Sequence, residues 1–135
     1  MPFNINRVAI LFRRELIRCF REYNIYPEQW QVLAMLWKEK SLSQTQIMNI
    51  TLQDAPATSK MLAKMAKNDL LKIETTKQDK RVKLVTLTKK GIAYKDVLPK
   101  KLLSHFKKLL KDFPENKQEE LLLLLKELRF SLGDI

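Results

Sequence analysis

Apolar residues recur at helical spacing in the first part of the chain. Residues 4–23 carry apolar side chains on one side and arginines on the other, which predicts an amphipathic helix. A second helix is predicted over residues 27–40, because Pro27 suits a first helical position, where no amide donor is missed. The spacing places these residues on its buried face: Trp30, Leu33, Leu36 and Trp37.

The middle of the chain predicts two shorter helices separated by a turn. Ser43 and Gln46 fit a capping box, which begins a helix through about Ile50. After the turn at residues 51–53, Asp54 or Ala55 caps a helix over about residues 55–67. Its inward stripe is Thr58, Met61, Leu62 and Met65. Its outward face carries Pro56, Lys60, Ala63 and Lys67, with Ser59 and Lys64 on the flanks.

Two short runs with alternating β-branched residues follow, at 71–75 and 82–87. They predict a β-hairpin whose connection, residues 76–81, is polar and basic. Thr88 is the expected N-cap of a long helix that runs to about Lys111, with a kink expected at Pro99.

A last helix begins near Pro114. In this helix Leu121–Leu125 and Leu128 leave no polar face for more than a turn, and such a helix must be buried. The pattern therefore predicts a mainly α fold with a small β-wing, in one domain spanning residues 1–135. A winged helix-turn-helix lobe covers 26–91, and the helices in 1–25 and 92–135 form a dimerisation region.

Charge narrows the choice of partner. The sequence holds 26 lysines and arginines against 15 acidic residues, a formal net charge of +11. Such a chain attracts polyanions, either nucleic acid or an anionic membrane, although charge can also serve solubility alone. A membrane-surface role would need basic and apolar faces exposed together, whereas the terminal helices are predicted to be buried, so we expect no membrane partner.

The chemistry of an enzyme is missing from the sequence. One histidine, one cysteine and two glycines leave no catalytic constellation, no phosphate-binding glycine loop and no metal-ligand set, so we expect no enzyme activity, cofactor or metal. The single cysteine and the lack of a signal-peptide pattern after Met1 lead us to expect a cytoplasmic protein.

Several ordered motifs resemble the multiple-antibiotic-resistance regulator (MarR) family. They are the segment Tyr26-Pro27-Glu28-Gln29-Trp30, the Ser43 capping box, Asp79-Lys80-Arg81, and Leu87-Thr88-Lys89-Lys90-Gly91. The resemblance implies a homodimeric winged helix-turn-helix transcription regulator, with terminal helices of both subunits at the interface. It also implies that a small effector, often phenolic or otherwise aromatic, binds between the dimer interface and the DNA-binding lobes.

The chain departs from the family pattern at three places. Asn68-Asp69 stands where a glycine usually ends the recognition helix, and either residue can adopt the left-handed conformation at some cost. Tyr26 replaces the usual capping threonine. Lys60 replaces a common arginine and offers a point charge in place of a bidentate fork.

The predicted DNA-binding residues lie on three segments. The helix over 55–67 fits the major groove, and the wing over 76–82 reaches the minor groove, with Arg81 inserted there or bound to the phosphates beside it. The helix beginning near Ser43 can hold a phosphate, although Ser43 and Gln44 can also serve as a cap alone. Asp79 is expected to hold the wing turn or to orient Arg81. The residues are Ser43, Gln44, Pro56, Ser59, Lys60, Ala63, Lys64, Lys77, Lys80, Arg81 and Lys83.

Aromatic residues provide a candidate effector pocket. Phe12, Trp30 and Trp37 are expected to line it, although aromatic residues at helical spacing also make ordinary core. Cys19 is expected to pack rather than to sense peroxide, because Glu15 and Glu22 flank it on the helix and would raise its pKa. His105 is expected at the edge of a leucine seam.

These residues predict a homodimeric DNA-binding regulator, a repressor that reads a palindromic operator and that a small molecule can release. The alternative is a winged-helix module that binds a protein or RNA without operator specificity. Two features favour double-stranded DNA: the lysines lie at the start of a groove-sized helix, and apolar chain ends imply a two-fold dimer.

Overall fold

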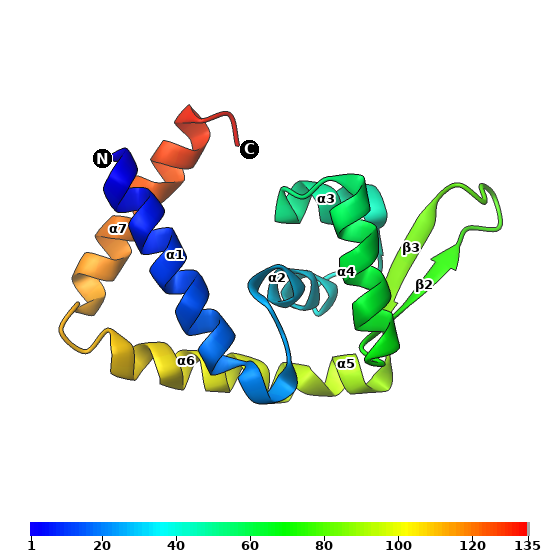
Figure 1. Ribbon diagram of the computed structural model, residues 1–135, viewed down its shortest axis with the longest axis horizontal. Coiled ribbons are helices and arrows are strands. Elements are labelled where there is room, and N and C mark those ends of the chain that lie inside the picture. The colour runs from blue at the N-terminus through cyan, green and yellow to red at the C-terminus, as the bar shows by residue number, and fades with distance from the viewer. Residues whose placement is uncertain (135) are drawn as a thin grey trace. The chain divides into compact units, whose positions relative to one another are not determined.

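The computed structural model describes residues 1–134, which are mainly helical and carry one small sheet (Figure 1). The α-helices are α1 (Pro2–Cys19), α2 (Pro27–Leu36), α3 (Gln44–Thr51), α4 (Ala55–Lys67), α5 (Lys89–Ala93), α6 (Leu98–Leu109) and α7 (Glu115–Ser131). The strands are β1 (Leu42–Ser43), β2 (Leu71–Thr75) and β3 (Lys83–Leu87), and short 3-10 turns cover Arg21–Tyr23 and Tyr94–Asp96. The predicted fold class, mainly α with a small β-wing, is confirmed.

The chain divides into two compact units, Met1–Leu102 and a second unit that begins at Leu103. The first unit holds the hydrophobic core, in which Phe20, Leu33, Ile47, Leu62 and Val85 have no measurable exposure. Each of these side chains contributes about 1.5–3 kcal/mol by leaving water. They come from the end of α1, from α2, α3 and α4, and from β3, so a single core fixes these elements to one another.

The helix-turn-helix is formed by α3 and α4. Ser43 caps α3: its Oγ accepts from the Gln46 amide at 3.1 Å, and the Gln46 side chain accepts from the Ser43 amide at 2.8 Å. This capping box was predicted. The chain then reverses at Leu52, whose φ of 56° lies in the left-handed region, and Asp54 begins α4 by accepting from the Ala57 amide at 2.8 Å.

The sheet is antiparallel with strand order β1-β3-β2. Leu71 pairs with Leu87 and Thr75 with Lys83, so β2 and β3 form the predicted hairpin, which projects beside α4 (Figure 1). Strand β1 pairs with β3 through Leu42 and Val85 and was not predicted from sequence. A two-residue strand carries no alternation of its own, and here it leads directly into the cap of α3.

Three predicted helix boundaries were wrong. The first helix ends at Cys19 rather than residue 23, because Asn24 takes a left-handed φ of 54° after a 3-10 turn. The second ends at Leu36 rather than residue 40. The long helix breaks at residues 94–97 instead of kinking at Pro99, which lies in the first turn of α6, since a proline ring excludes a helical turn before it.

The buried face of α2 also differs from the prediction. Gln29, Val32, Leu33 and Leu36 are buried, whereas Trp30 and Trp37 are half-buried. Gln29 lies inside because its side-chain oxygen accepts from the Tyr26 amide at 3.0 Å, which begins the helix without a capping hydroxyl. Compared with the prediction, the buried face of α2 is therefore rotated toward the side of the helix that carries Gln29.

The second unit contains most of α6 and all of α7. Of the α7 leucines that were expected to be buried, Leu121–Leu125 are exposed in the single chain, from 40% for Leu121 to 61% for Leu123, and Leu128 is half-buried. Their burial against a partner remains a prediction. Within residues 1–134 no helix is long and apolar enough to cross a bilayer.

Candidate nucleic-acid interface

The outer face of α4 is the centre of the candidate interface. Thr58, Met61, Leu62 and Met65 are buried, as the stripe predicted, and this burial turns the opposite residues to solvent. The Thr58 hydroxyl donates to the Asp54 carbonyl at 2.8 Å, so it is satisfied within the helix. The exposed residues on this face are Pro56, Ser59, Lys60, Ala63 and Lys64.

The C-terminal end of α4 forms a Schellman motif. The Leu70 amide donates to the Met65 carbonyl and the Asp69 amide to the Ala66 carbonyl, both at 3.0 Å. Asp69 holds the left-handed position with φ of 61°, where a glycine would carry no steric cost. The departure at Asn68-Asp69 therefore leaves the helix end intact, because Asp69 takes the conformation that the motif needs.

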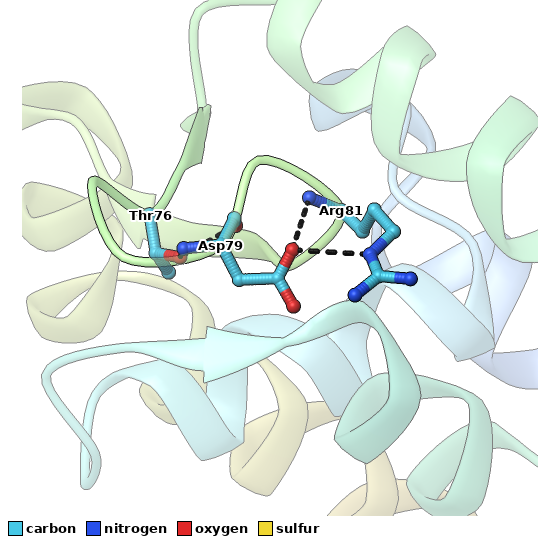
Figure 2. A network of polar contacts seen from close by, with 3 residues as sticks. All are labelled: Thr76, Asp79 and Arg81. Carbon is cyan, nitrogen blue, oxygen red and sulfur yellow. Dashed lines mark hydrogen bonds and ion pairs between the residues drawn. The ribbon is translucent and has the colours of Figure 1, made fainter.

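The wing turn is organised by Asp79 (Figure 2). Its Oδ1 accepts from the Arg81 amide at 2.9 Å and from the Arg81 Nε at 3.3 Å. The Asp79 amide donates to the Thr76 hydroxyl oxygen at 2.9 Å, and that hydroxyl donates to the Asp79 carbonyl at 2.6 Å. Asp79 thus holds the turn and also orients the Arg81 side chain, which is 93% exposed.

A hollow of about 290 Å³ joins the three segments of the candidate interface. The start of α3, the start of α4 and the wing all contribute to its lining, and Arg81 and Lys83 make it basic. Free amides at helix N-termini and basic side chains together favour an anion. The lining residues are Ser43, Gln44, Thr45, Met48, Ala55, Arg81, Val82 and Lys83.

Two lining residues, Thr45 and Met48, were not among the predicted site residues. Met48 lies one turn after Gln44 on α3, so helical spacing from Gln44 was the signal that could have found it. Within the same region the Gln44 Nε2 donates to the Ser59 Oγ at 2.7 Å, a bond between α3 and α4 that crosses fifteen positions of sequence.

The remaining predicted lysines lie around this centre. Lys77 and Lys80 are exposed in the wing connection, outside the lining of the hollow. The Lys64 ammonium lies 5.4 Å from the centre of the Tyr26 ring, a cation–π contact that the sequence did not suggest. Tyr26, which stands where the family has a capping threonine, therefore contacts a lysine on the exposed side of α4.

Two of the three candidate effector residues, Trp30 and Trp37, pack against the core. Trp30 stacks on Phe20 at 5.1 Å between ring centres and meets Trp37 edge-on at 5.5 Å. The Trp37 Nε1 donates to the Gly91 carbonyl at 2.9 Å. Phe12 lies on an exposed part of α1. These contacts favour the ordinary core interpretation for both tryptophans, and an effector pocket lined by all three residues remains a prediction.

Cys19 is 3% exposed, in agreement with a packing role. Burial raises the pKa of its thiol, and the nearby Lys101 ammonium lowers it in part. The predicted direction, a raised pKa, is confirmed, but its cause is burial rather than Glu15 and Glu22. Glu15 is paired with Arg14 and Arg18, and Glu22 with Lys101. His105 is half-buried beside Phe106 in the second unit. Residues 1–134 contain no group of three or more side chains arranged to hold a metal ion.

Comparison with known proteins finds similarity to one family. A sequence model described as the MarR family matches residues 23–82, from the 3-10 turn before α2 to the wing connection before β3. An uncharacterized HTH-type transcriptional regulator of Staphylococcus aureus is 34% identical over 70 residues, which are 52% of this chain and 48% of the relative. Over residues 23–82 this chain is similar to the MarR family. The alignment spans about half the length of the S. aureus relatives that it matches.

Longer matches extend over most of this chain. The HTH-type transcriptional regulator YwoH of Bacillus subtilis is 27% identical over 115 residues, covering 85% of this chain and 83% of the relative. A crystal structure of a mutant MarR from E. coli complexed with operator DNA has a TM-score of 0.84 at 21% identity. It covers 94% of this chain and 91% of the other. At that identity the likeness establishes a shared fold.

Proposed function

We propose that this chain is a DNA-binding transcription regulator, a repressor that reads a palindromic operator. The observation that carries the proposal is the exposed face of α4, whose two ends are fixed by the Asp54 cap and the Schellman motif at Asp69. A helix held in this way fits the major groove of B-DNA with its first turns toward the base edges.

The proposed contacts follow from chemistry and position. Lys60 reaches guanine or a phosphate, Ser59 a base edge, and Ala63 a thymine methyl group. Lys64 contacts a phosphate. The wing brings Arg81 to the minor groove, where the potential is most negative. The hollow at the starts of α3 and α4 takes a phosphate of the same strand.

A two-fold dimer is part of the proposal. The exposed leucines of α7 are an apolar surface that a second copy of the chain can cover. Two copies would present two α4 helices to half-sites separated by one turn of DNA. The S. aureus and B. subtilis relatives are named as HTH-type transcriptional regulators, and the E. coli MarR mutant binds operator DNA, both of which support this function.

Release by a small aromatic or phenolic effector is also proposed, with Phe12, Trp30 and Trp37 as its candidate site. Support for this part is limited to the row of rings that Trp30 and Trp37 form, because an aromatic ligand can stack at the end of such a row. Binding of the effector would have to favour a dimer whose α4 spacing does not match the operator.

The proposal is tested by selecting bound fragments from random DNA with the purified protein and then measuring affinity for the selected site. Replacing Lys60 or Arg81 by alanine is expected to weaken that affinity by about tenfold, because each change removes a contact to base or phosphate. Lys38→Ala, an equal charge change at an exposed position after α2, is the control and should change affinity by less than about twofold.

Failure to select any DNA would contradict the proposal and would favour a protein or RNA partner. Unchanged affinity in both the Lys60 and the Arg81 variants would refute the site assignment while leaving DNA binding in place.

A further inference from the structure

The hydrogen bond between Gln44 and Ser59 joins the first residue of α3 to the outward face of α4. The Gln44 Nε2 is the donor and the Ser59 Oγ the acceptor, at 2.7 Å. Both residues lie beside the hollow or on the exposed face of the candidate interface. The bond therefore fixes the orientation of the Ser59 hydroxyl, which faces the base edges under the proposed function.

A serine hydroxyl has one proton to donate and two lone pairs that accept. When the Gln44 amide occupies the near side as a donor, the Ser59 proton cannot point toward it and is directed elsewhere. Within residues 1–134 the hydrogen-bond partner of the Ser59 side chain is Gln44. The neighbouring Thr58 differs, because its proton is used by the Asp54 carbonyl inside the helix.

We infer that Gln44 acts as a positioning residue that presets Ser59 as a hydrogen-bond donor, so that Ser59 determines specificity by preferring base atoms that accept. This inference rests on the proposed function. In the major groove the acceptors are the N7 of purines, the O6 of guanine and the O4 of thymine. Cytosine presents only its N4 amino group, which is a donor. Cytosine is therefore the base that Ser59 rejects at the position it meets.

The direction of the bond can be reversed without touching α4. In Gln44→Glu, a carboxylate replaces the amide and can only accept, so the Ser59 proton turns toward it. The outward side of Ser59 then carries lone pairs alone. This variant should accept the amino groups of cytosine and adenine and should lose the preference for acceptors.

The experiment compares the base frequencies selected from random DNA by the wild type and three variants. Ser59→Ala identifies the position, because it should flatten the preference at one base pair in each half-site. At that position of the contacted strand the wild type should exclude cytosine, and Gln44→Glu should raise the cytosine frequency by about tenfold. Thr45→Glu places the same new charge on the adjacent exposed residue and is the matched control. It should weaken binding while keeping the wild-type preference.

Thermal melting of each variant checks that it is folded, and these surface positions allow all three to fold. The inference is overturned if Gln44→Glu and Thr45→Glu select the same bases, or if Ser59→Ala changes no position. If the wild type itself selects no DNA, the proposed function fails and the inference fails with it. Selection of a site without the cytosine change overturns the inference alone.

Discussion

At the scale of single residues, the Asp79 carboxylate in the wing holds Arg81 in place, although its own negative charge would repel DNA. Asp79 lies beside the cation proposed to meet DNA, yet it holds the Arg81 amide and guanidinium and closes the turn with Thr76 (Figure 2). Sequence alone predicted this role, because an aspartate bonding the amide two residues later is a local pattern. The Gln44–Ser59 bond was not predictable, since it depends on how α3 packs against α4.

The variant Asp79→Ala separates the ordering of Arg81 by Asp79 from the repulsion between the Asp79 charge and DNA. Removal of a negative charge near DNA should tighten binding if long-range electrostatics dominate. We expect the opposite, a weakening of about fivefold, because a free Arg81 must be ordered on binding at a cost of about 1 kcal/mol. Fluorescence anisotropy with the selected operator measures the change. Glu74→Ala, an exposed carboxylate on β2, is the control, and tighter binding in both variants would contradict the ordering role.

At the scale of elements, helix beginnings were more predictable than helix ends. Ser43, Asp54 and Thr88 were identified as caps because a hydroxyl or carboxylate bonds an amide within three residues. The ends of α1 and α2 and the break before α6 depend on tertiary packing and were misplaced. The third strand was missed for the same reason, since only its pairing with β3 defines it.

Gly91 in α5 shows how packing overrides local preference. A Cβ added there would lie 2.2 Å from the Leu70 carbonyl oxygen, a backbone atom three residues after the end of α4. Helix propensity alone favours alanine over glycine by about 1 kcal/mol. We nevertheless expect Gly91→Ala to lower the free energy of unfolding by at least about 2 kcal/mol, because α5 must move away.

Urea unfolding measures this change. Lys89→Ala, an exposed position of the same helix, should stay within about 0.5 kcal/mol of the wild type. A Gly91→Ala protein as stable as that control would show that the contact with Leu70 is relieved at no cost.

At the scale of the whole molecule, the second unit supplies the exposed apolar surface that the proposed dimer requires. Its leucines are exposed in one chain, and the sequence correctly marked them as residues without a polar side. What covers them was beyond sequence reasoning, since an apolar run does not name its partner. The distribution of charge agrees with this division, because the basic wing and α4 belong to the first unit and the apolar run to the second.

Deletion of residues 114–135 should abolish dimerisation and, with it, tight operator binding. Because a truncation can also unfold, Leu123→Glu offers a milder test at a residue already 61% exposed in the single chain. It should convert the dimer to monomer in sedimentation and leave the melting of the first unit in place, since a buried charge without a partner is costly.

Asn116→Glu adds the same charge to α7 at an exposed polar position and should leave the dimer intact. A Leu123→Glu protein or a truncated chain that sediments as a dimer would place the interface elsewhere.

The inferred role of the Gln44–Ser59 bond has a consequence for how such regulators would diverge in evolution. If one residue on α3 decides which atoms a serine on α4 accepts or donates to, two paralogues with identical recognition helices can read different operators. A new target could then arise by a single codon change, CAA or CAG to GAA or GAG, outside the helix that touches the bases. A recognition code tabulated from α4 alone would assign both paralogues the same site.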